Sequence, residues 1–190
     1  MNAARKFLFA AVCLVQLAVP ASLIAKHEQT RSAGTPYRFQ AAPVDPNDPY
    51  RGKYVALRYA VEREPVPFAD QGFVYMGYNR RVYAELGTGP DGYARLVKVH
   101  DERPAGVDYI DVFTRHLAER AQGDNAAPTA IHVQLPFDRY YLPEDVAPQV
   151  EAAYIEAARK AQSNTWAEVR VRDGHGALVG LFLDGKPVQP

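Results

Sequence analysis

The stretch that decides the fold is residues 42–59, which read APVDPNDPYRGKYVALRY. Its three prolines fix their own φ angles and keep the preceding residues out of the helical region, so the first half predicts a rigid turn. Gly52 permits the bend that opens the second half. From Lys53 onward apolar and polar side chains alternate, which predicts a half-buried β-strand. We expect its core face to hold Val55, Leu57, Tyr59 and Val61, and its other face Tyr54, Arg58 and Glu62.

The chain beyond residue 34 predicts a mainly β domain. One clear helix is expected over residues 145–162, with Asp145 as its cap and Pro148 in its first turn, where proline is tolerated. Residues 108–120 favour a strand that ends in a turn of helix. The other expected strands are 35–41, 73–78, 81–86, 93–99, 130–135, 166–172 and 177–183. Many short strands and one helix indicate an antiparallel sandwich or a partly open barrel.

The N-terminus predicts a membrane segment. Arg5 and Lys6 precede an apolar run over residues 7–25, close to the length that a spanning helix needs. We expect an uncleaved anchor in the bilayer, with the N-terminus inside and the domain outside the cytoplasm. A secretory signal peptide cleaved after Ala21 is the alternative. The polar residues 26–34 then form a short linker, and residues 35–190 form the exported domain.

The composition excludes several classes of function. A net charge of zero gives no electrostatic footprint for nucleic acid. Cys13 is the only cysteine and lies in the apolar run, so the exported domain has no disulfide. The serines are Ser22, Ser32 and Ser163, none of them placed as a nucleophile. We expect no catalytic residue, no cofactor and no metal site, because no two histidines have ligand spacing.

Two stretches supply the candidate binding surface, the 42–59 segment and residues 139–144, which read RYYLPE. Arginine and tyrosine are enriched at protein interfaces, so these side chains predict a recognition surface. The structural alternative is that they form core, turns and ion pairs between loops. The candidate residues are Asp45, Asp48, Arg51, Gly52, Tyr54, Leu57, Arg58, Tyr59, Arg139, Tyr141 and Glu144.

The same segments carry a resemblance to a known family. Residues 52–59, GKYVALRY, resemble the eight-residue signature of the GDYXXLXY-domain family, and residues 139–144 and 180–185 resemble its later segments. The resemblance spans residues 35–187. Members of that family are functionally uncharacterised bacterial proteins attached to the membrane, and they accompany multi-pass membrane proteins. One position departs from the signature, because Lys53 stands where the family has aspartate, so no acid or metal role carries over to it.

Together these observations predict a binding or accessory module anchored in the bacterial cytoplasmic membrane, with its domain in the periplasm. The resemblance implies a multi-pass membrane protein as the partner. A cell-envelope enzyme that uses carboxylates such as Asp45 and Glu144 is the first alternative. A sensor domain for a small ligand, with a cavity lined by tyrosines, is the second.

Overall fold

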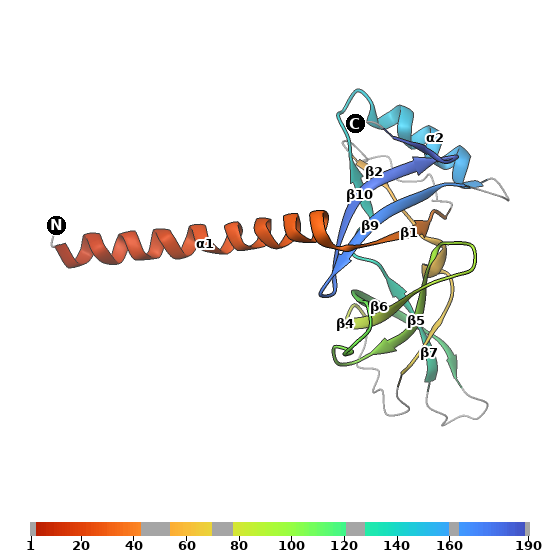
Figure 1. Cartoon of the computed structure of the whole chain (residues 1–190), viewed down its shortest axis with the longest axis horizontal. Coiled ribbons are helices and arrows are strands. Elements are labelled where there is room, and N and C mark those ends of the chain that lie inside the picture. The colour runs from red at the N-terminus through yellow and green to blue at the C-terminus, as the bar shows by residue number, and fades with distance from the viewer. Residues whose placement is uncertain (1–2, 43–53, 70–77, 121–127, 160–163, 189–190) are drawn as a thin grey trace.

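The computed structural model describes residues 3–42, 54–69, 78–120, 128–159 and 164–188. A long N-terminal helix projects from a mainly β domain that holds two sheets, a short β-ribbon and one further helix (Figure 1). Of the predicted elements, the strand at 73–78 lies almost wholly outside the described residues.

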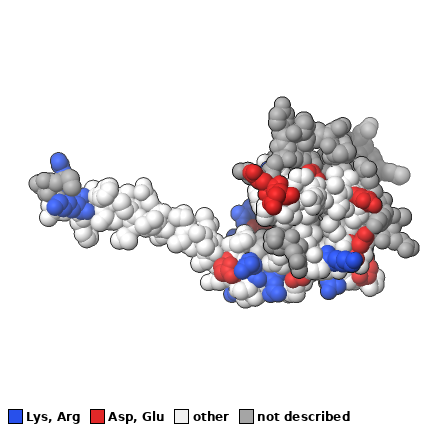
Figure 2. Space-filling model, turned by 90° about the horizontal axis from the view of Figure 1, so that it is seen from above, with Lys and Arg blue, Asp and Glu red and all other residues white. Residues whose placement is uncertain are grey.

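Helix α1 spans Ala3–Ala33, 31 residues, which corresponds to a length of about 46 Å. It is long and apolar enough to cross a membrane by length and composition, and its apolar part is not buried by the domain. Lysine and arginine side chains mark its N-terminal end, and charged side chains gather again where it meets the domain (Figure 2).

The helix does not stop where the apolar run stops. Residues 26–33, which we expected to form a linker, continue α1 to Ala33. The segment contains no glycine or proline before Gly34, so nothing in it breaks the helix. Gly34 N donates to Thr30 O (2.9 Å) at the end of the helix. A side chain at Gly34 would approach that carbonyl oxygen within 2.5 Å, so glycine suits this turn.

Five strands form a nearly closed barrel, in the order β3-β7-β6-β4-β5. All four pairings within this sheet are antiparallel. The two edge strands approach each other, because Phe68 bridges Val99 and Ala69 N donates to Val99 O. The strands are β3 (Val66–Pro67), β4 (Arg81–Thr88), β5 (Ala94–His100), β6 (Tyr109–Arg120) and β7 (Pro128–Gln134).

A second antiparallel sheet has the order β1-β9-β10-β11. Its hairpins turn at Asp173-Gly174 and Asp184-Gly185, where all four residues have positive φ. Positive φ at both central residues is what a two-residue type I′ hairpin turn requires, and Asp-Gly is a favoured pair for it. The strands are β1 (Thr35–Gln40), β9 (Trp166–Arg172), β10 (His175–Leu183) and β11 (Lys186–Pro187).

A two-stranded ribbon and a helix complete the domain. Strand β2 (Tyr54–Ala56) pairs with β8 (Arg139–Tyr141), and α2 (Ala147–Arg159) packs against β2. After β2 the chain enters a short 3₁₀ helix, Ala60–Glu62. One continuous apolar core joins residues of both sheets, the ribbon and α2.

The predicted fold class is confirmed, with the barrel alternative closer to the structure than the sandwich. Two element predictions need correction. Residues 108–120 form strand to Arg120 without a helical turn, because β6 pairs with β7 as far as Arg120. Helix α2 begins at Ala147 rather than at Asp145, since Val146 N and Ala147 N both donate to Pro143 O and the preceding residues form a turn.

Candidate functional site

The structure divides the predicted binding residues into four groups. Asp45, Asp48, Arg51 and Gly52 lie outside the described residues, as does Lys53. Of the rest, some belong to a buried junction in the core and some to an exposed patch, and Glu144 lies apart from both.

Leu57 and Tyr59 form the buried junction. Leu57 is 2% exposed and Tyr59 1%, and Val55 and Val61 are buried beside them, so the predicted core face is confirmed. The Tyr59 hydroxyl donates to Phe137 O (2.9 Å), and its ring packs edge-to-face against Phe39 and Phe137. Burial raises the pKa of Tyr59 well above its usual value, which keeps the hydroxyl protonated as a donor.

Tyr154 of α2 completes this junction from the other side. Its hydroxyl accepts from Arg58 N (3.2 Å) and lies within donating distance of Ala42 O and Arg58 O (both 3.2 Å). Ala42 N donates in turn to Arg58 O (2.8 Å). Burial raises the pKa of Tyr154 to about 12. The backbone of the signature segment therefore ties the end of β1 to α2.

The position of Glu62 differs from the predicted alternation of buried and exposed side chains. It was expected on the outward face, but the strand ends at Ala56 and the 3₁₀ turn brings its carboxylate inward. The carboxylate accepts from Leu135 N (2.9 Å) and Tyr59 N (3.2 Å). Burial raises the Glu62 pKa, and these two N–H donors oppose the rise. Glu62 thus supplies acceptors to two backbone N–H groups, one at the start of the 3₁₀ turn and one directly after β7.

The exposed patch consists of Tyr54, Arg139 and Tyr141 on the β2–β8 ribbon. Tyr54 lies directly opposite Tyr141, with ring centroids 5.9 Å apart, and the Arg139 guanidinium lies 5.1 Å from the Tyr54 ring centre. Tyr141 is 67% exposed. A hydrogen bond that Arg139 donates to the Tyr141 side chain raises the pKa of Arg139, and the charge of Asp138 acts in the same direction. The structure thus brings together three of the predicted residues as an aromatic and cationic surface.

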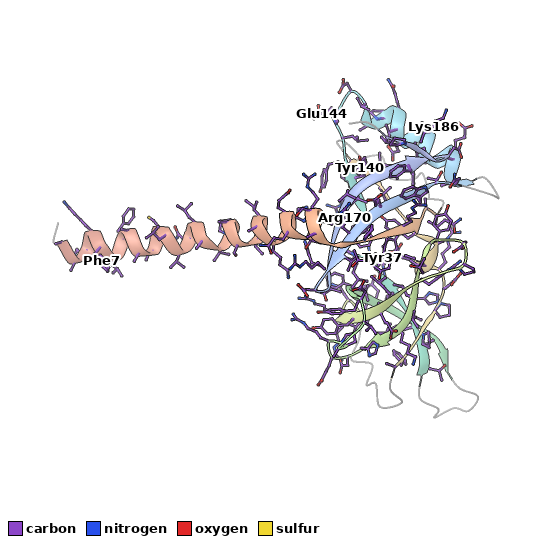
Figure 3. The ribbon with its side chains drawn as sticks, in the orientation of Figure 1. Phe7, Tyr37, Tyr140, Glu144, Arg170 and Lys186 are labelled. Carbon is purple, nitrogen blue, oxygen red and sulfur yellow. The ribbon has the colours of Figure 1, made fainter. Side chains whose placement is uncertain are left out.

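Glu144 occupies a different place. It lies exposed before α2, at the end of the domain away from Arg170 (Figure 3). Within the described ranges, no cluster of three or more histidine, cysteine, aspartate or glutamate side chains has the arrangement of a metal site.

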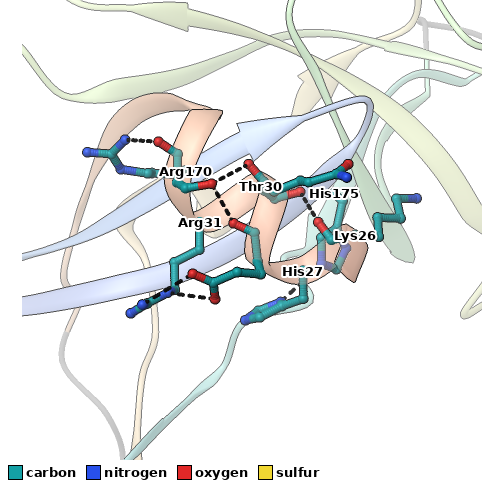
Figure 4. Close-up of polar contacts among 9 residues, drawn as sticks. Lys26, His27, Thr30, Arg31, Arg170 and His175 are labelled. Carbon is teal, nitrogen blue, oxygen red and sulfur yellow. Dashed lines mark hydrogen bonds and ion pairs between the residues drawn. The ribbon is translucent and has the colours of Figure 1, made fainter. Parts of the chain in front are cut away.

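A second polar constellation lies where α1 meets the sheet. Arg170 of β9 donates from Nη1 to Ser32 O (3.2 Å), and Thr30 is 1% exposed beside the strands. His27 Nδ1 lies 3.3 Å from His175 Nε2 at the start of β10 (Figure 4). Burial lowers the pKa of His175, with His27 and Lys26 acting in the same direction and Asp111 opposing them. These contacts hold the end of α1 against the domain.

This junction forms an open pocket of about 440 Å³. One wall comes from α1, where Arg31 Nε contacts Glu28 Oε2 at 3.1 Å, and the other from β9 and β10. The lining residues are Glu28, Arg31, Ser32, Glu168, Arg170, Val179, Gly180 and Phe182. Two arginines and two glutamates give these walls no net charge.

Sequence reasoning missed this junction because it treated residues 26–34 as a linker. A signal was present, since Glu28 and Arg31 stand three residues apart, as charged pairs do on a helix. The partners on β9 and β10 are about 140 residues away in the chain, as the separation of 138 between Ser32 and Arg170 illustrates. No local pattern connects residues at that distance.

Comparison with known proteins gives a single assignment. Neither a search of curated proteins nor one of solved structures finds a match. The family model described as GDYXXLXY protein matches residues 16–181, which include the signature segment, the five-stranded barrel, α2, β1, β9 and most of β10. The chain therefore belongs to the GDYXXLXY protein family.

Proposed function

We propose that this protein is a binding or accessory module anchored in the cytoplasmic membrane, with its β domain outside the cytoplasm, and that it works with a multi-pass membrane protein. The observation that carries the proposal is the continuity of α1. One helix contains the whole apolar run and also, seven residues later, the Ser32 carbonyl that Arg170 binds. The domain is thereby held at a fixed distance from the apolar segment.

The extent of the apolar run beyond the candidate cleavage site favours the anchor over the signal peptide. Residues 19–21, the candidate cleavage site, lie within α1, eleven residues before the contact of Ser32 with the sheet. Cleavage after Ala21 would leave a helix of about twelve residues, too short to span a bilayer. The apolar run also continues through Leu23 and Ile24, which an anchor explains and a cleaved leader does not.

Two surfaces support binding of a partner. The patch of Tyr54, Arg139 and Tyr141 has the residue types that dominate interface energetics. In the membrane, Ala11, Ala18 and Ala25 recur every seven residues and therefore lie on one face of α1. Small residues on a transmembrane helix let a second helix approach closely, which suits a partner that itself spans the membrane.

Crosslinking from native membranes tests the proposal. A photo-reactive residue at Tyr141 should capture a multi-pass membrane protein, whereas the same residue at Val97, exposed on the barrel, should not. Capture that is equal at both positions, or absent at both, would count against the patch. Ala18→Leu should lower the yield, and Val12→Leu on another face of α1 serves as its control.

Mass spectrometry of the purified protein tests the anchor separately. Peptides from before Ala21 should be present in protein isolated from the membrane fraction. A mature N-terminus at Ser22 would refute the anchor.

The sequence also suggested a cell-envelope enzyme that uses carboxylates, but no observation among the described residues favours that function. Glu144 does not line the junction pocket, and Asp45 is not described.

A further inference from the structure

The pocket between α1 and the second sheet lies at the depth of lipid headgroups if α1 spans the bilayer. Glu28 lies three residues beyond Ala25, the end of the apolar run, and Arg31 lies six beyond it, which correspond to about 5 and 9 Å along the helix. The headgroup layer of one leaflet is about 5–8 Å thick. The wall that α1 contributes therefore begins within this layer and reaches its outer edge.

The charges of the pocket suit a zwitterion better than an anion. Arg31 and Arg170 have guanidinium donors beyond those directed at Glu28, at Ser32 and, at 4.0 Å, at Glu168, since a guanidinium has five N–H groups. Planar forks of this kind recognise phosphate well. Glu28 and Glu168 place carboxylates on the same two walls, where they would repel a purely anionic ligand and attract an ammonium group.

The apolar part of the pocket suits the remainder of a lipid. Val179, Gly180 and the ring of Phe182 line it on β10, and Phe182 stacks on Trp166 with ring centroids 3.8 Å apart. Gly180 adds no side chain to this lining. Because the pocket is open rather than enclosed, a ligand can enter it from outside the domain.

We infer that this pocket binds the phosphoethanolamine headgroup of a membrane phospholipid. Arg31 and Arg170 hold the phosphate, Glu28 and Glu168 hold the primary ammonium, and Phe182 and Val179 contact the glycerol. The inference rests on the proposed membrane anchor, because the anchor is what brings the pocket to headgroup depth. It adds a specific lipid contact to the proposed accessory role.

Titration of the full chain in detergent tests the inference. Trp166 is the only tryptophan and stacks on a residue of the pocket, so its fluorescence reports binding there. The ligands are short-chain phosphatidylethanolamine, phosphatidylcholine and phosphatidylglycerol. We expect the first to bind most tightly, because the second has no N–H donor for the glutamates and the third has no cation. Equal affinity for all three, or tighter binding of phosphatidylglycerol, would overturn the assignment.

Single substitutions test which side chains bind the phosphate and which bind the ammonium group. Arg31→Gln should weaken phosphatidylethanolamine binding about tenfold, the factor that corresponds to about 1.4 kcal/mol. Glu28→Gln should reduce the preference for phosphatidylethanolamine over phosphatidylglycerol. Arg95→Gln is the matched control, since Arg95 is an ion-paired arginine on the barrel, bound to Asp91. Unchanged binding by Arg31→Gln would refute the inference, and thermal unfolding of each variant confirms that it is folded.

A soluble compound with the same headgroup tests whether the ligand is a membrane lipid or a soluble metabolite. Glycerophosphoethanolamine offers the pocket the same phosphate, ammonium and glycerol but lacks the acyl chains that hold the lipid in the detergent micelle around α1, so it should bind far more weakly; equal affinity would assign the pocket to a soluble metabolite and refute the lipid. The lipid titration and the test of the anchor can fail independently. Every residue that lines the pocket lies after Ala21, so the pocket residues are present whether or not the N-terminal segment is cleaved. A cleaved N-terminus would refute the anchor and still leave the titration readable.

Discussion

Tyr154→Phe isolates what the hydroxyl of one buried tyrosine contributes to the junction of α2 with the signature segment. Tyr154 is 0% exposed, and the phenylalanine ring fills the same space, so the variant creates no large cavity. What it removes is the acceptor for Arg58 N and the donor that lies 3.2 Å from Ala42 O. Arg58 O retains its bond from Ala42 N.

The expected loss follows from the group left unpaired. A buried backbone N–H without a partner costs about 1–3 kcal/mol, which is more than the net contribution of an ordinary hydrogen bond. For a protein of this size each kcal/mol lowers the melting temperature by about 2–4 °C. Thermal unfolding of the full chain in detergent, followed by Trp166 fluorescence, should therefore show a decrease of about 2–12 °C.

Tyr141→Phe provides the matched control. It is the same chemical change at a residue that is 67% exposed, so the free energy of unfolding should change by no more than about 0.5 kcal/mol. If the two variants lose the same stability, or if Tyr154→Phe loses none, the Tyr154 hydroxyl does not support the Arg58 backbone and the account of this junction is wrong.

Alkaline pH supplies an independent check on Tyr154. Burial raises its pKa from 10.0 to about 12, so between these values the folded state binds more protons than the unfolded state. Stability must then fall as pH rises through that window. Phenylalanine has no such proton, so the stability difference between the wild type and Tyr154→Phe should shrink above pH 10. A difference that stays constant to pH 12 would contradict the burial of the hydroxyl.

Three further predictions follow from other positions. Leu57→Ala should destabilise the domain by about 2–5 kcal/mol in urea unfolding, whereas Arg58→Ala, at the exposed neighbouring residue, should have little effect. Equal losses of stability would show that the buried and exposed faces of this segment have been assigned wrongly. Burial lowers the pKa of His175, so at acidic pH the unfolded state binds more protons than the folded state, and the contact of α1 with β10 should weaken as pH falls below 6.5. Hydrogen exchange of residues 27–33 measures this weakening, and His175→Gln should remove its dependence on pH. Lys53→Asp, at a residue outside the described ranges, should leave folding and partner capture unchanged within about 0.5 kcal/mol, and a loss of capture would place function in that charge.

The sequence alone determined the features that depend on local pattern. The apolar run of residues 7–25 predicted a helix of spanning length, because that property depends only on composition and length. Alternation after Lys53 identified Leu57 and Tyr59 as core, because side chains on successive residues of a strand point to opposite faces. The Asp173-Gly174 turn was also readable, because positive φ at both positions favours this pair.

Only the tertiary structure decided how these pieces meet. Glu62 broke the predicted alternation because the strand ends at Ala56, and its carboxylate binds Leu135 N, 73 residues away. The continuation of α1 onto the sheet brings Ser32 to Arg170 and His27 to His175, and thereby makes the pocket. Periodicity reports which face of an element is apolar, but it carries no information about which distant element covers that face. Contacts between residues more than a hundred positions apart depend on the packing of the whole domain.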